Sequence, residues 1–165
     1  MAKSKVSDIV ARRRKVAVAG YNGDEVLARE GLVDPAGDVR ATALGALLRM
    51  GHLTVSDIEA ALSDEDSVVR RRACEVSAAL PVEGVTSALS DSDPLVVEAA
   101  CFALGERGVG TEGAAVAALS AVATGHSDPL CREAAIAALG AIGDEAGLSA
   151  ILAAMEDKPA VRRRA

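Results

Sequence analysis

One segment of the chain occurs twice. The stretch SDPLVVEAACFALGERG at 92–108 returns as SDPLCREAAIAALGAIG at 127–143, in register at an offset of 35 residues. A shorter pair, ALSDEDSVV at 61–69 and ALSDSDPLV at 88–96, has an offset of 27 residues. Internal periods of this size are typical of solenoids. Each unit of a solenoid has an apolar face that only a neighbouring copy can bury.

Each unit of the repeat predicts two helices. The first begins at an Asp-Pro pair, which supplies an N-cap and a first-turn proline, and ends at a glycine. The Asp-Pro pairs are Asp34-Pro35, Asp93-Pro94 and Asp128-Pro129, and the glycines are Gly51, Gly108 and Gly143. The second helix is shorter, with an apolar stripe such as Val55, Ile58 and Leu62.

The repeat predicts an all-α fold, a right-handed α-solenoid (superhelix) of helical hairpins. Residues 1–33 form a basic segment with a degenerate capping helix pair, residues 34–157 form four full units, and residues 158–165 begin a further, incomplete one. Half of the chain is apolar, yet it has no Trp, one Tyr and one Phe. Its apolar mass is therefore Ala, Val, Leu and Ile, and the small side chains among these let helices approach closely.

The frame D-P-x-x-V-R-x-x-A-x-x-A-L-G-x-x-G resembles HEAT repeats, in the short form of the phycobilisome-lyase type. This architecture serves lyases, hydroxylases, glycosylases and plain scaffolds, so the resemblance implies the fold more than an activity. HEAT-like hydroxylases that modify a lysine of a translation factor bind iron through paired His-Glu motifs. Here Leu53 follows His52 and Ser127 follows His126, so that activity is not expected. The aromatics of HEAT-like DNA alkylation-repair proteins are also missing, and no bilin-binding residue can be assigned.

An arginine and an acid recur once per unit. The arginines are Arg40, Arg70, Arg132 and Arg162, and the acids, just after the second helix, are Asp34, Asp64 and Asp91. Opposite charges at a fixed offset predict a structural ladder of ion pairs between adjacent units. A phosphate-binding ridge is the alternative, and we favour the ladder.

Arginine runs suggest a nucleic-acid-binding edge. The runs are Arg12, Arg13 and Arg14, then Arg70, Arg71 and Arg72, and finally 162–164. Residues 1–20 carry a net charge of +5 and residues 158–165 a net charge of +4, so the remainder carries −15 to give the total of −6. An acidic body with no aromatics between the arginines disfavours nucleic acid. Ordinary solvated helix faces are the better interpretation.

The second helices are predicted to line an acidic concave surface suited to a basic peptide. Its candidate partner-binding acids are Asp57, Glu59, Glu83, Glu112, Asp144 and Glu145. An empty solvated face explains these residues equally well. Phe102 points away from the core stripe of its helix, which is a reason to expect that a partner or a second subunit covers it. A single exposed aromatic is also ordinary.

Catalytic signatures are absent from the sequence, so we expect no enzyme activity, no cofactor and no metal. The three cysteines fit reduced thiols in a cytoplasmic, bacterial protein, and no run is apolar enough for a membrane span. The predicted function is a scaffold that binds a basic protein segment in its acidic groove. The alternatives are a nucleic-acid-binding module that uses the arginine edge and an accessory subunit of a lyase or maturation enzyme. Oligomer formation through the exposed C-terminal end is a further expectation.

Overall fold

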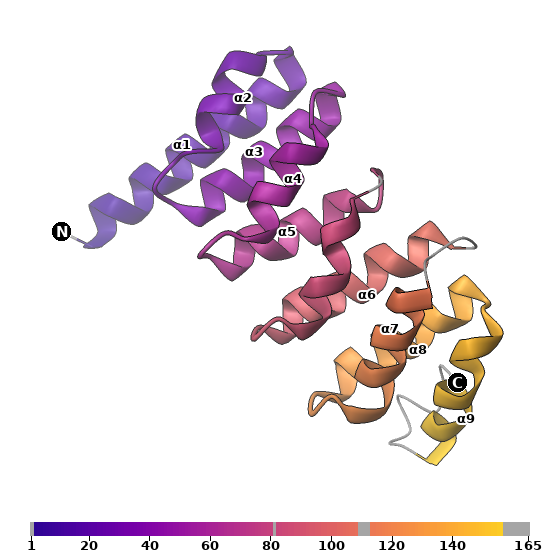
Figure 1. Cartoon of the computed structure of the whole chain (residues 1–165). Helices are drawn as coiled ribbons and strands as arrows, with labels where there is room; N and C mark the ends of the chain where they lie inside the picture. Colours follow the sequence, from indigo (N-terminus) through magenta and orange to yellow (C-terminus); the bar gives the residue numbers. More distant parts are fainter. Residues whose placement is uncertain (1, 81, 109–112, 157–165) are drawn as a thin grey trace. The chain divides into compact units, whose positions relative to one another are not determined.

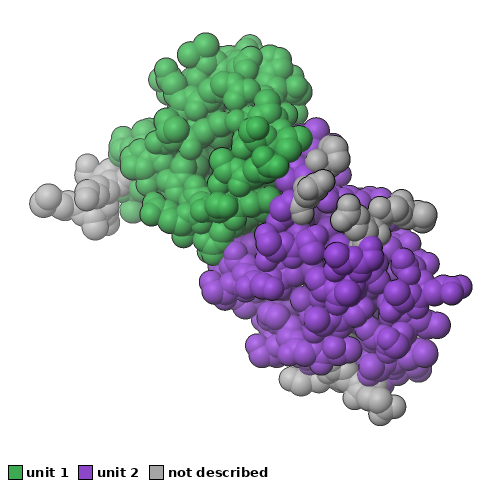
Figure 2. Space-filling model, in the orientation of Figure 1, with its two compact units in different colours: residues 1–76 green, residues 77–165 purple. Residues whose placement is uncertain are grey.

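The computed structural model describes residues 2–80, 82–108 and 113–156, and every regular element within these ranges is helical (Figure 1). The predicted all-α solenoid class is confirmed. The chain divides into two compact units, Met1–Val76 and Ser77–Ala165, which are coloured separately in Figure 2. We call them unit 1 and unit 2.

Unit 1 contains the first helical hairpins. The elements are α1 (Ala2–Asn22), α2 (Glu25–Gly31), α3 (Gly37–Met50), α4 (Val55–Leu62) and α5 (Ser67–Ser77), whose last residue falls in unit 2. Helices α1, α2 and α3 pack against one another. The largest fully buried side chains of unit 1 include Leu44, Leu47 and Ile58, which come from α3 and α4. The longer first helices and the shorter second helices thus share one apolar core.

Unit 2 repeats the arrangement. The elements are the 3₁₀ helix η1 (Glu83–Ser90), α6 (Pro94–Arg107), α7 (Gly113–Gly125), α8 (Pro129–Ile142), η2 (Glu145–Gly147), α9 (Leu148–Ala153) and η3 (Ala154–Glu156). Helix α6 packs on α8, and α7 packs on α8, α9 and η1. The N-cap Val82 is buried, as are Val85, Ala88 and Leu89 of η1, and the steps from 82 to 85 and from 85 to 88 match the three residues per turn of a 3₁₀ helix.

Helix ends follow the capping residues of the repeat, with one difference. Asp93 and Asp128 cap α6 and α8, which begin at the prolines that follow them. In the first full unit, however, α3 begins only at Gly37, and not at Asp34-Pro35 as predicted. The Asp34 carboxylate accepts a hydrogen bond from the Ala36 N–H at 2.8 Å. The Asp93 N–H makes the same bond to Asp91 before α6, so Asp34 corresponds to Asp91, and Ala36 takes the N-cap position of Asp93.

Successive first helices approach closely at glycine. A Cβ atom added to Gly20 on α1 would lie 2.8 Å from the Ala46 Cα on α3, and one added to Gly105 on α6 would lie 3.0 Å from the Ala138 Cα on α8. Both distances are shorter than a normal Cβ contact. The glycine of the repeated Leu-Gly step at Gly105 therefore serves backbone-to-backbone packing.

Candidate functional site

The recurring arginine clamps the loop that precedes its helix. Arg40 Nη1 donates to the carbonyl of Asp34, six residues earlier, at 2.8 Å. The equivalent bonds run from Arg70 to the Asp64 carbonyl and from Arg132 to the His126 carbonyl, at 2.8 and 2.7 Å. The arginine of the Val-Arg step thus fixes the connection between one hairpin and the next.

The same arginine position also joins neighbouring hairpins in unit 1. Arg40 binds the Asp64 carboxylate with two hydrogen bonds of 2.8 and 2.6 Å, and both side chains are largely buried, with 12% and 15% exposed. Arg12 binds Asp34 in the same two-pronged way, at 2.8 and 3.2 Å. The structure therefore places one rung of the predicted ladder, Arg40–Asp64, in unit 1, and it pairs the ladder acid Asp34 with Arg12, an arginine of the predicted nucleic-acid edge.

Burial and hydrogen bonding oppose each other at these carboxylates. Burial alone would raise the pKa of Asp64, but hydrogen bonds from Arg40 and from the Asp66 N–H lower it below its ordinary value. At Asp34, burial is likewise outweighed by the bonds from Arg12 and from the Ala36 N–H, and the pKa is lowered. The Asp64 hydrogen bond raises the pKa of Arg40. Both pairs are ionised and serve structure.

Unit 2 departs from the pattern at one repeat. Val97 takes the arginine position on α6 and is fully buried. His126 takes the position of the acid, and its Nδ1 accepts a hydrogen bond from the Asp128 N–H at 3.1 Å. Asp91 makes the corresponding bond to the Asp93 N–H at 2.9 Å. His126 therefore caps this loop in place of the acid.

The arginine runs are mostly engaged in contacts within the chain. Arg13 donates to the Thr42 hydroxyl at 3.2 Å. Arg71 and Arg72 both bind Glu75, at 3.0 and 2.9 Å. With Arg12 and Arg70 bound as described above, Arg14 is the member of these two runs for which the structure gives no bonded partner among the described residues. Arg162 lies outside the described residues. These bonds favour a structural role over a nucleic-acid edge.

The predicted acids of the second helices have varied roles. The Asp57 carboxylate accepts from the Thr54 N–H at 2.9 Å in a capping box, and Arg29 donates to it at 3.2 Å. Asp144 accepts from the Ala146 N–H at 2.8 Å at the start of η2. Glu59 and Glu145 are exposed. Glu112 and the Glu83 side chain lie outside the described residues. Of the predicted acids that the structure describes, two are tied to helix starts.

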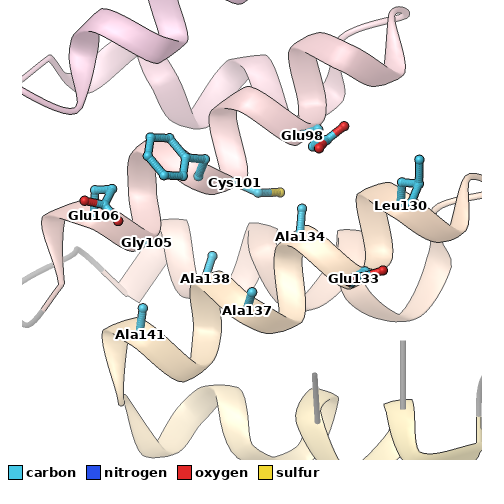
Figure 3. Close-up of a pocket in the computed structure, with 11 residues that line it drawn as sticks. Glu98, Cys101, Gly105, Glu106, Leu130, Glu133, Ala134, Ala137, Ala138 and Ala141 are labelled. Carbon is cyan, nitrogen blue, oxygen red and sulfur yellow. The ribbon is translucent and has the colours of Figure 1, made fainter. Parts of the chain in front are cut away.

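A groove on the first helices of unit 2 brings Phe102 together with acids that the sequence analysis did not single out. It encloses about 350 Å³ between α6 and α8 (Figure 3). Its floor is made by small residues, among them Gly105, Ala134 and Ala138. Phe102 and Leu130 line it while 55% and 57% exposed. The complete lining is Glu98, Cys101, Phe102, Gly105, Glu106, Leu130, Glu133, Ala134, Ala137, Ala138 and Ala141.

The charge of this groove is negative. Glu98 and Glu106 come from α6 and Glu133 from α8, as Figure 3 shows, and none of the residues given as lining the groove is Lys or Arg. A signal for part of it was present in the sequence: Glu98, Phe102 and Glu106 recur every four residues, and such a spacing places them on one helix face. Glu133 joins them only through the packing of α6 on α8.

The Cys131 thiol of α8 is not poised for nucleophilic chemistry. Cys101, Cys74 and Cys131 are free and buried. Burial, with the negative charges of Asp128 and Glu98, raises the pKa of Cys131 to about 11. Its Sγ lies 3.3 Å from the Pro94 carbonyl, to which the protonated thiol donates. A thiol with this pKa is protonated at neutral pH and is a poor nucleophile.

The described part of the chain contains neither a metal-binding cluster nor a membrane-spanning helix. No group of three or more His, Cys, Asp or Glu side chains there is arranged to hold a metal ion. Among the described helices, none combines the length and the apolarity that a membrane crossing requires.

Comparison with known proteins gives a family and solved structures of similar fold. Residues 82–165 match the family model of HEAT repeats. The structure is similar to that of human deoxyhypusine hydroxylase in complex with glycerol, with a TM-score of 0.57 and 22% sequence identity. The match covers 92% of this chain and 63% of the hydroxylase chain, and at this identity it concerns the fold alone. No curated protein matches the sequence.

Proposed function

Because the chain belongs to the family of HEAT repeats, which generally mediate protein–protein interaction, we propose that it is a non-enzymatic scaffold that binds a basic segment of a partner protein in the acidic groove between α6 and α8. No cofactor takes part in this function.

The observation that carries the proposal is the combination of exposed apolar and acidic side chains in one groove. Phe102 is the only phenylalanine of the chain, and more than half of it is exposed at a groove that also holds Glu98 and Glu106. Apolar side chains gain free energy when a partner covers them, and the surrounding glutamates select the sign of the partner's charge. The groove therefore favours an amphipathic segment with Lys or Arg beside its apolar residues.

The small floor residues support a helix as the bound form. Gly105 and the alanines of α8 project little from their backbones, so a partner helix can approach α6 and α8 closely. Helix-in-groove recognition places apolar side chains at i, i+3, i+4 and i+7 in such a cleft. On such a helix, basic side chains next to the apolar stripe would lie near Glu98, Glu106 and Glu133.

Peptide titration tests this proposal. The probe is a fluorescent amphipathic helical peptide of Leu, Ala and Lys, and its affinity for the full chain is measured by anisotropy. The triple variant E98Q/E106Q/E133Q is expected to bind about tenfold more weakly, because three partly solvated charge pairs together contribute about 1.5 kcal/mol. F102A is expected to lose a similar amount through the lost apolar contact.

A matched control separates this groove from general acidity. The variant E30Q/E59Q/E145Q removes the same charge from acids outside the groove, including the predicted candidates Glu59 and Glu145, and should bind like the unmodified chain. If the two triple variants weaken binding equally, net charge explains the affinity and the groove assignment is wrong. If only the control variant weakens it, the second helices carry the site.

A further inference from the structure

A second groove lies in unit 1, between α1 and α2. It encloses about 540 Å³, and its apolar lining includes Val10, Val18 and Leu27. Val10 is 59% exposed and Val18 46% exposed, whereas Val16 and Ala19 of the same helix are buried. Helix α1 therefore has one apolar face in the core and a second apolar face open to solvent.

The open face is basic. Arg14 and Lys15 line the groove, and the structure gives neither of them an ion-pair or hydrogen-bond partner among the described side chains. Their neighbours Arg12 and Arg13 instead bind Asp34 and Thr42. The groove also contains one acid, Asp24, whose carboxylate caps α2 by accepting from the Leu27 N–H at 3.0 Å.

We infer that the α1–α2 groove is a docking site for an acidic amphipathic helix of a partner protein. Its exposed valines require an apolar stripe on the occupant, since water is displaced from them only by apolar side chains. Arg14 and Lys15 require carboxylates beside that stripe. Charge complementarity therefore gives the α1–α2 groove an acidic occupant, whereas the segment proposed for the α6–α8 groove is basic.

Apolar lining distinguishes this occupant from nucleic acid. A phosphate backbone is bound by a row of cations and by stacking on aromatic side chains. The α1–α2 groove instead offers two cations flanked by aliphatic side chains. A helix with Leu at i and i+4 and Glu beside them matches both features of the groove.

The test uses an amphipathic helical peptide of Leu, Ala and Glu, titrated into the isotope-labelled full chain and followed by NMR. We expect saturable binding, with the largest chemical-shift changes in α1 and α2. R14Q/K15Q should weaken binding about tenfold, since it removes two charge pairs close to an apolar contact, and V10S should also weaken it. All three altered side chains are exposed, so the fold is retained.

Two control variants show whether binding of the acidic peptide depends on the α1–α2 groove and not on general charge or on the α6–α8 groove. R49Q/R71Q removes the same charge elsewhere and should leave affinity unchanged, and so should E98Q/E106Q/E133Q. Absence of saturable binding, or equal weakening by R49Q/R71Q, would overturn the inference. A dimer in sedimentation that R14Q/K15Q abolishes would assign the groove to a second copy of the chain. Duplex DNA that binds with the same dependence on Arg14 and Lys15 would assign it to nucleic acid. Both results would overturn the inference too.

Discussion

Helices α5 and α6 occupy the same register of the repeat with different side chains. At the 27-residue offset, Arg71 corresponds to Glu98 and Glu75 to Phe102. On α5, Arg71 and Arg72 both bind Glu75, so the single carboxylate of this helix is paired on the helix itself. On α6, the same positions place a carboxylate and an exposed aromatic ring in a groove without basic lining residues. One repeat frame thus produces a helix whose carboxylate is paired with its own arginines and a helix whose glutamates line an acidic groove.

The two units also differ in the ion pairs that join neighbouring hairpins. In unit 1, Arg12 and Arg40 each hold an acid of the following loop. In unit 2, Val97 has replaced the corresponding arginine and is buried in the core. A repeat can therefore have a buried apolar side chain in place of the arginine and still form its helical hairpin.

The largest effects should come from the close helix contacts that both units share. Gly20→Val and Gly105→Val place side-chain atoms within about 3 Å of a neighbouring backbone, and overpacking of this kind costs about 2–3 kcal/mol. Gly140→Ala is the control, because a Cβ there meets nothing within 4 Å. It should be neutral or stabilising by up to about 1 kcal/mol. Urea unfolding measures all three, and unchanged midpoints for the valine variants would contradict the packing.

A smaller loss of stability is expected when the Arg40 hydrogen bonds of unit 1 are removed. Arg40→Ala removes two bonds to Asp64 and one to the Asp34 carbonyl, which should lower the free energy of unfolding by about 1–2 kcal/mol. Glu65→Gln is the matched control, since Glu65 is 90% exposed and lies 3.9 Å from Arg40. Equal stability of both variants in urea would show that the clamp does not stabilise unit 1.

Acid should weaken unit 1 through the same pairs. The pKa values of Asp34 and Asp64 are lower in the folded chain than in the unfolded chain. Their stabilisation is therefore fully present above the unfolded pKa of about 3.9 and is lost as pH falls through the folded pKa. Hydrogen exchange of α3 amides should report a weakening from about pH 5 to about pH 2. Asp64→Asn should flatten this dependence, and an unaltered slope would contradict the assignment.

The smallest change in stability is expected at Phe102. Phe102→Ala removes a side chain that is 55% exposed, so the unfolding free energy should change by less than about 0.5 kcal/mol. Thermal unfolding checks this value. A loss of stability as large as that of Gly105→Val would mean that Phe102 belongs to the core. Weaker peptide binding by Phe102→Ala would then be an indirect effect of the destabilised fold.

The helical hairpins could be predicted from the sequence because apolar spacing, Asp-Pro starts and terminal glycines are local signals. The outward direction of Phe102 could be predicted for the same reason, since it follows from the helical wheel alone. The 3₁₀ form of η1 was not predicted, because its buried positions at 82, 85 and 89 fit an α-helix as well. The start of α3 was predicted too early, because Asp34-Pro35 resembles the helix-starting Asp-Pro pairs while Asp34 takes the loop position of Asp91.

Charge partners were harder to predict because they join residues of different hairpins. Asp57 has the sequence position of a surface acid, but Arg29, 28 residues earlier, binds it. Glu133 is separated from Glu98 by a full repeat, and only the packing of α6 on α8 gives them a common groove. Residue spacing along one helix predicts which face a side chain occupies, whereas tertiary contacts decide whether its charge is already balanced.

Grafting the α5 pattern onto α6 tests the central claim most directly. The double variant Glu98→Arg/Phe102→Glu recreates the Arg71–Glu75 arrangement at the equivalent positions, and its affinity for the Leu, Ala and Lys peptide is measured by anisotropy with helicity as a control. We predict a fully helical protein that binds the peptide at least tenfold more weakly, since the groove loses its aromatic ring and gains a cation that repels a basic peptide. Unchanged affinity in a folded variant would contradict the assignment of the acidic groove as the binding surface.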